Sequence, residues 1–202
     1  MSDQLELLNI KQLCKNFGGL RAVKDFDMTV PKGGLFGLIG PNGAGKTTVF
    51  NLITGVYSST SGSIQFKGED MIGLQPFEIT QQGIARTFQN IRLFSNLSVL
   101  DNVRIAYHAH AGYSMRDSLL RTHNFNAKEA ELTERAQEFL GVFGLQDRQG
   151  AIARNLPYGV QRRLEIARAL AAAPELLLLD EPAAGMNPKE TIALMELIHF
   201  IH

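Results

Sequence analysis

A glycine-rich run stands between an apolar segment and a segment with helical character. The run consists of Gly40, Pro41, Asn42, Gly43, Ala44, Gly45, Lys46, Thr47 and Thr48. Residues 35–39 before it are apolar and predict a strand, and residues 49–53 after it predict a helix. Glycines let successive backbone N–H groups turn around phosphates, and the following helix presents its positive end. The sequence therefore predicts a phosphate-binding loop for a nucleoside triphosphate.

Two side chains of this run suit the chemistry of a triphosphate. Lys46 can reach the β- and γ-phosphates, and the hydroxyl of Thr47 can bind Mg²⁺. A glycine-rich turn that matches by chance is the alternative, but both flanks of the run fit the phosphate loop. We therefore expect ATP and Mg²⁺ as ligands, with Lys46 taking part in catalysis.

Composition limits the remaining possibilities. With 202 residues and 45% hydrophobic content, the chain can form one large or two small folding units. Its 20 basic and 20 acidic residues cancel, so the basic surface expected of a nucleic-acid-binding protein is missing. No leader-like segment and no run of about 18 apolar residues is visible. We expect a cytosolic chain, or one that binds a membrane only through a partner.

Hydrophobic periodicity predicts an α/β fold. Alternating residues predict a β-rich layer around the phosphate loop, and helical spacing dominates later in the chain. The stretch 108–126 is polar and irregular, which predicts a surface excursion. The expected strands are 5–13, 22–30, 62–68 and a buried 176–179, and the expected helices are 76–83, 127–143 and 161–173.

Two acidic residues, Asp180 and Glu181, follow the buried strand. Open parallel sheets place catalytic groups at the carboxyl ends of their strands. Asp180 is suited to holding Mg²⁺, and Glu181 to polarising the water that attacks the γ-phosphate. The pair alone could equally be a helix N-cap with a first-turn acid. The phosphate loop upstream favours the catalytic interpretation.

In these motifs and their order the chain resembles the ATP-binding cassette ATPases. Phe17 lies where that family stacks an aromatic ring on adenine, although a core or turn aromatic is the alternative. Gln89 matches the Q-loop glutamine that touches Mg²⁺ and the attacking water, although alone it would be an ordinary surface residue. Gly159 lies within 156–163, the place of the signature loop, and residues 184–188 fit the D-loop.

The resemblance implies a P-loop NTPase core with an N-terminal antiparallel β subdomain and a helical subdomain. Residues 1–88 and 158–202 would form the core and β subdomain of a single shortened domain, and 89–157 the helical subdomain. Two such cassettes, identical or homologous, would enclose two ATP molecules head to tail. Membrane permease subunits and, indirectly, a solute-binding protein would be the other partners, at the cytoplasmic face of the plasma membrane.

The resemblance narrows to the LivG-type ATPases of branched-chain amino-acid importers. It is carried by residues 17–23, 86–94, 158–159 and 181–188 and covers essentially the whole chain. The ATPase of lipopolysaccharide export is the nearest alternative, but the Ala-Ala-Gly-Met-Asn-Pro run at 183–188 favours the importer. The implied function is ATP hydrolysis coupled to import of branched-chain or related amino acids.

Three departures from the family pattern affect the expected activity. Pro157 replaces a small hydroxyl residue and lacks a backbone N–H, and Val160 replaces a polar residue. The sequence ends at His202, before the last strands and the switch histidine of the family, so we expect a fragment or a naturally shortened copy. A nucleotide-binding module with little hydrolysis is the alternative. Cassettes of DNA repair or translation would be expected to carry a coiled-coil insertion or a second cassette, and neither is visible.

Overall fold

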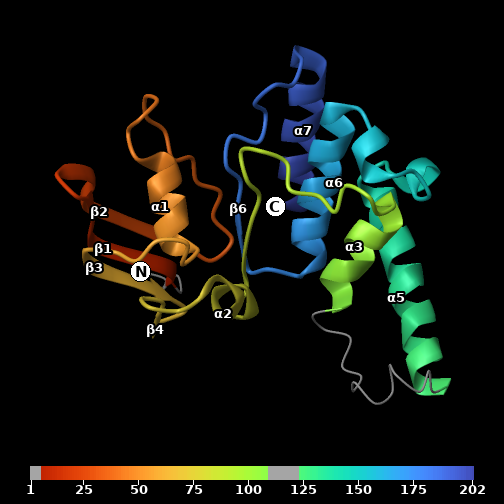
Figure 1. Cartoon of the computed structure of the whole chain (residues 1–202), viewed down its shortest axis with the longest axis horizontal. Coiled ribbons are helices and arrows are strands. Elements are labelled where there is room, and N and C mark those ends of the chain that lie inside the picture. The colour runs from red at the N-terminus through yellow and green to blue at the C-terminus, as the bar shows by residue number, and fades with distance from the viewer. Residues whose placement is uncertain (1–5, 109–122) are drawn as a thin grey trace. The chain divides into compact units, whose positions relative to one another are not determined.

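The computed structural model describes residues 6–108 and 123–202. They divide into two compact units, one running up to Ile84 together with His202, and one from Ala85 to Ile201 (Figure 1). Among the described residues, no helix combines the length and the apolar character needed to cross a membrane.

The first unit is built on a four-stranded antiparallel sheet with the order β2-β1-β3-β4 (Figure 1). Alternation sends one side of the sheet into the core, where Leu8, Ile10 and Leu13 are buried. The strands predicted at 5–13, 22–30 and 62–68 are confirmed. The elements are β1 (Glu6–Phe17), β2 (Leu20–Pro31), α1 (Lys46–Ile53), β3 (Ser61–Phe66), β4 (Glu69–Asp70) and α2 (Pro76–Gln81).

The strand predicted at residues 35–39 was wrong. This run has no regular secondary structure. Leu35, Phe36 and Ile39 are 55%, 55% and 94% exposed, which is unusual for such large apolar side chains. A strand needs a neighbour for its backbone hydrogen bonds, and no strand of the described residues pairs with this segment. Apolar character alone therefore did not produce a strand here.

The second unit combines a short sheet with a helical core. Strand β5 (Ile84–Arg86), which begins at the last residue of the first unit, pairs with β6 (Leu176–Leu178), and the Thr87 N–H donates to the Leu178 carbonyl at 2.9 Å. The predicted strand is thus confirmed, although Leu178 is its one buried residue and Leu176 and Leu177 are only partly buried. The remaining elements are α3 (Val99–His108), α5 (His123–Val142), η1 (Gln146–Arg148), η2 (Ala153–Asn155), α6 (Tyr158–Ala171) and α7 (Pro188–Ile201).

Helices α3, α5 and α6 share one apolar core in this unit, to which Val103, Leu140 and Leu164 contribute. The helices predicted at 127–143 and 161–173 are confirmed, each starting three or four residues earlier than predicted. The excursion predicted for 108–126 needs correction at both ends, because His108 is the last residue of α3 and residues 123–126 form the first turn of α5. Residues 109–122 of that stretch lie outside the described residues.

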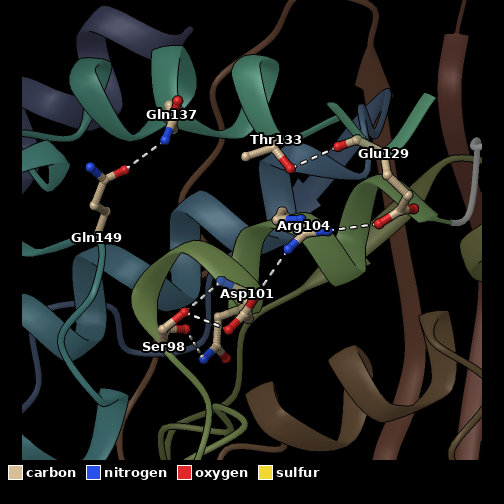
Figure 2. Close-up of polar contacts among 8 residues, drawn as sticks. Ser98, Asp101, Arg104, Glu129, Thr133, Gln137 and Gln149 are labelled. Carbon is tan, nitrogen blue, oxygen red and sulfur yellow. Dashed lines mark hydrogen bonds and ion pairs between the residues drawn. The ribbon is translucent and has the colours of Figure 1, made fainter. Parts of the chain in front are cut away.

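Polar contacts fix the start of α3 and join it to α5. Ser98 accepts a hydrogen bond from the Asp101 N–H at 3.0 Å and donates its hydroxyl to the Asp101 carboxylate at 2.6 Å. Arg104 then bonds Asp101 at 3.3 Å and Glu129 of α5 at 2.7 Å (Figure 2). The cap satisfies an N–H that has no partner within the helix. The Arg104–Glu129 pair joins α3 to α5, whereas the Asp101–Arg104 pair lies within α3.

A buried amide supports the segment that leads into α3. Asn102 is fully buried, accepts from the Phe94 N–H at 2.9 Å, and donates to the carbonyls of Phe94 and Ser98 at 3.1 and 2.9 Å. Asn102→Leu keeps the size but leaves these groups unpaired, so we expect the free energy of unfolding to fall by about 3 kcal/mol. Urea unfolding measures it. The exposed Asn96→Leu is the control, and an equal effect of the two changes would contradict the account.

Candidate functional site

The glycine-rich loop leads directly into α1 and is closed by its own lysine. Lys46 is the first residue of α1, and its Nζ donates to the carbonyl oxygens of Gly40 and Pro41 at 2.6 and 2.9 Å. The Ala44 N–H donates to the Pro41 carbonyl at 3.1 Å. The ammonium group therefore lies over the loop, at the start of a helix whose free N–H groups favour anions.

Gly45 is required by its backbone conformation and by its surroundings. Its φ is 90°, and a Cβ at this position would lie 2.5 Å from the carbonyl oxygen of Ala22 in β2. A side chain there would move the loop, the strand or both. Gly43 has a similar φ of 83°, but nothing lies within 4 Å of a Cβ placed on it.

This difference gives a matched pair of substitutions. We expect Gly45→Ala to weaken nucleotide binding by about tenfold or more, because backbone strain of 1–3 kcal/mol adds to the collision with Ala22. Gly43→Ala introduces the strain without the collision, so its effect should be several times smaller. Calorimetric titration with ATP measures both affinities. Equal losses in the two variants would show that the contact with Ala22 does not matter.

Phe17 is an exposed aromatic residue at the end of β1. Its side chain is 41% exposed, and its ring meets the ring of Tyr57 edge to face, with centroids 5.2 Å apart. The Lys15 Nζ lies 4.9 Å from the Phe17 centroid. Phe17 is thus not a core residue. Its exposed ring could stack on a planar ligand.

The acidic pair after β6 is divided between a buried and an exposed carboxylate. Asp180 is buried, and its Oδ2 accepts from Arg86 Nη2 at 2.8 Å, with side-chain exposures of 5% and 4%. Glu181 is exposed, and its Oε2 accepts from Gln89 Nε2 at 2.9 Å. The second unit therefore brings together two of the predicted site residues, Gln89 and Glu181.

Sequence reasoning missed two arginines in this region. Arg86 pairs with Asp180, as described above. Arg162, in α6, is fully buried and donates to the carbonyl oxygens of Asp180 and Glu181, both at 2.9 Å. Glu165 follows Arg162 by three residues, which is the spacing of an ion pair on one helix face. That spacing was the only sign in the sequence that Arg162 has a buried partner.

Gly159 lies in the first turn of α6 and is buried against α7. A Cβ at Gly159 would come within 2.6 Å of the Glu190 Oε1, so the carboxylate of Glu190 takes the space beside it. Pro157 is the N-cap of α6, where its carbonyl accepts from the N–H groups of Val160 and Gln161 at 3.0 Å. The N–H of an N-cap residue makes no hydrogen bond within the helix. Pro157, which has no N–H, is therefore compatible with this helix start.

The predicted metal ligands are Thr47 in the first unit and Gln89 and Asp180 in the second. Their hydroxyl, amide and carboxylate oxygens are the hard donors that Mg²⁺ prefers, and Mg²⁺ commonly binds through one or two protein groups plus phosphates. Within the part of the chain that the structure describes, no group of three or more His, Cys, Asp and Glu side chains could hold a metal ion. Each of the three predicted ligands thus offers an oxygen donor of the kind that suits Mg²⁺ bound to a nucleotide.

A glycine-rich loop that leads into α1 with a lysine, and an acidic pair after a later strand, are typical of nucleotide-binding ATPase modules. Residues 23–184 of the chain match the ABC transporter family, and the chain belongs to that family. The members of this family are ATP-hydrolysing transport subunits. The predicted family is confirmed.

Curated relatives place the chain more narrowly. It is 45% identical over 192 residues to the high-affinity branched-chain amino acid transport ATP-binding protein LivG of Escherichia coli, and 44% identical to BraF of Pseudomonas aeruginosa. Both alignments cover 95% of this chain and 75% of the relative. The lipopolysaccharide export protein LptB of Escherichia coli is 36% identical over 96% of this chain. The predicted resemblance to LivG-type ATPases is confirmed.

Solved structures agree with the fold. An ATP-binding cassette of an ABC transporter in its ADP conformation has a TM-score of 0.81 and 31% identity, over 97% of this chain and 76% of that chain. A nucleotide-free ATP-binding cassette gives 0.80 and 31%, over 97% and 77%. A cassette in a post-hydrolysis dimer bound to ADP and phosphate gives 0.78 and 26%, over 95% and 81%. The predicted P-loop NTPase fold is confirmed, and so is nucleotide binding by this class of domain.

Proposed function

We propose that this chain is the ATP-binding subunit of a transporter that imports branched-chain or related amino acids. The observation that carries the proposal is the 45% identity to LivG over 95% of the chain. The lower identity to LptB, at 36%, makes lipopolysaccharide export the weaker alternative.

The proposed nucleotide contacts begin at the phosphate loop. Lys46 would exchange the carbonyls of Gly40 and Pro41 for phosphate oxygens, which is a stronger interaction because both partners are charged. The backbone of residues 40–48 would surround the phosphates. Phe17 would stack on the adenine, and Gly159 of a second cassette would face the γ-phosphate.

The proposed base and the residue that orients the water lie on the second unit, whereas Thr47 lies on the first. Glu181 would accept the proton of the attacking water as a general base, and Gln89, which contacts it at 2.9 Å, would orient that water. Thr47, Gln89 and Asp180 would hold Mg²⁺. When bound, this ion neutralises charge on the β- and γ-phosphate oxygens.

The proposed assembly follows from the transport role. Residues 1–88 and 158–202 would form the core and β subdomain, and residues 89–157 the helical subdomain. A second ATPase subunit would complete the two nucleotide sites, and membrane permeases would hold the pair at the cytoplasmic face of the plasma membrane. A solute-binding protein would deliver the substrate to the permeases.

One observation favours a second candidate, a nucleotide-binding module with little hydrolysis. The carboxylate of Asp180 is already engaged by Arg86 in a buried ion pair at 2.8 Å. If that pair persists with nucleotide bound, Asp180 contributes less to the metal, and turnover is slow while binding is retained.

Leucine uptake tests the transport role. The chain is expressed in Escherichia coli cells that lack LivG, and uptake of labelled leucine is measured at low concentration. We expect the wild-type chain to restore uptake and Lys46→Ala to leave it at the level of the deletion strain. If uptake stays at that level although the wild-type chain is as abundant as LivG normally is, the transport role is wrong. That result would not contradict ATP binding by the chain.

A further inference from the structure

The largest fully buried side chain of the described residues is a charged one, Arg162. It lies on α6 and uses its whole guanidinium. Nε donates to the Pro182 carbonyl at 3.0 Å, Nη1 to the Phe88 carbonyl at 2.6 Å, and Nη2 to the carbonyls of Asp180 and Glu181 at 2.9 Å. One side chain thus binds two backbone segments that lie 74 and about 20 residues away in the sequence.

Glu165 supplies the opposite charge. Its side chain is 2% exposed, its Oε2 accepts from Arg162 Nη1 at 2.6 Å, and its Oε1 accepts from the Arg92 N–H at 3.0 Å. A buried ion pair is costly unless both ions are paired and hydrogen-bonded, and a pair of this kind is weak evidence for stability. Glu165 binds the backbone of Arg92, and Arg162 binds four carbonyls. These hydrogen bonds specify where the surrounding backbone lies.

The backbone that Arg162 holds is strained at the proposed general base. Glu181 has a φ of 44°, which lies in the left-handed backbone region that residues other than glycine rarely adopt. Such strain persists only where the surroundings over-determine the conformation. Arg162 binds the carbonyls of residues 180, 181 and 182, so it contacts the backbone at the strained residue and on both sides of it.

The same guanidinium also fixes the start of the segment that carries Gln89. It binds the carbonyl of Phe88, the residue directly before Gln89. The side chains of Gln89 and Glu181 then meet at 2.9 Å. Arg162 therefore binds both of the backbone segments on which this contact depends.

We propose that Arg162, held by Glu165, is a positioning residue for ATP hydrolysis that sets Gln89 and Glu181 against each other. The proposal rests on the hydrolytic role proposed above for those two residues. Arg162 touches no reacting atom, and it acts through the carbonyls of residues 88 and 180–182. Removing it should therefore lower kcat while ATP binding at the phosphate loop stays intact.

Arg162→Gln and Arg135→Gln form a matched pair for steady-state ATP hydrolysis. Arg135 is an exposed arginine of α5 in the same unit, and its Nη2 pairs with the Glu131 Oε1 of the same helix at 2.8 Å. We expect Arg162→Gln to lower kcat by about 100-fold, the effect of misplacing a catalytic group by about 1 Å, with KM for ATP nearly unchanged. Arg135→Gln should keep the wild-type kcat. A wild-type kcat in Arg162→Gln overturns the inference and leaves the proposed function standing.

Glu165→Gln provides a milder change, because it keeps the shape of the side chain and removes the charge that holds Arg162. We expect kcat to fall by about tenfold, again at constant KM. This variant decides the question if Arg162→Gln does not fold. A folded Glu165→Gln protein with wild-type kcat contradicts the proposal.

Amide hydrogen exchange tests the positioning without any turnover. In Arg162→Gln, exchange should quicken in residues 86–92 and 180–183, and exchange in residues 6–31 should match that of the wild type. Arg135→Gln should quicken neither segment. If exchange in residues 86–92 and 180–183 is unchanged in Arg162→Gln, the inference is wrong whatever the ATPase rate. If instead the wild-type chain shows no ATP turnover, only the hydrolytic role proposed for Gln89 and Glu181 is wrong.

Discussion

Glu181→Gln should lower ATP turnover by about 100- to 10,000-fold, the range found for removing a general base. Glu181 is exposed and contacts Gln89 at 2.9 Å, so glutamine fits the same space and can still form a hydrogen bond. It cannot accept a proton from water near neutral pH. Because the phosphate loop is unchanged, ATP affinity should stay within about threefold of the wild type. Phosphate release measures the turnover, and equilibrium titration measures the affinity.

The control for this change is Glu196→Gln. Glu196 is an exposed glutamate of α7, and its replacement changes the net charge of the chain by the same amount. It should leave turnover and affinity unchanged. If Glu181→Gln hydrolyses ATP as fast as the Glu196 variant, Glu181 is not the base.

Lys46→Ala should weaken ATP binding by about 10- to 100-fold. Its ammonium group is the charged donor over the loop, and a hydrogen bond to a charged group is worth about 1.5–3 kcal/mol. The substitution also removes the two bonds, at 2.6 and 2.9 Å, that tie the side chain to the carbonyls of Gly40 and Pro41. ATP turnover should fall with the affinity. Calorimetric titration with Mg-ATP measures the loss.

Lys32→Ala is the matched control, because Lys32 is an exposed lysine of the same unit before the phosphate loop. Its affinity for ATP should equal that of the wild type, and both variants should melt within a few degrees of it. If the ATP affinities of Lys46→Ala and Lys32→Ala agree within twofold, Lys46 does not bind the phosphates.

The elements that the sequence predicted correctly are those with a strong local pattern. Alternating residues predicted β1, β2 and β3 because side chains of a strand face opposite sides of the sheet. Helical spacing predicted α5 and α6 for a similar reason. The segment 35–39 is just as apolar, yet it forms no strand, because pairing depends on a neighbouring strand and not on the segment itself.

The candidate site also has features that the sequence could predict and features that it could not. The phosphate loop could be predicted because one continuous run supplies its glycines, Lys46 and Thr47. The role of Arg162 could not, since its partners are backbone carbonyls at residues 88 and 180–182, which give no pattern in the sequence. The left-handed backbone of Glu181 was equally invisible, because glutamate rarely adopts it.

Phosphate release from ATP by the purified 202-residue protein, measured with and without Mg²⁺, shows whether this chain binds and hydrolyses ATP. The account predicts Mg²⁺-dependent release by the wild-type chain that falls at least about 100-fold in Glu181→Gln and at least about tenfold in Lys46→Ala. Equal release by all three proteins, or release that does not need Mg²⁺, would contradict it.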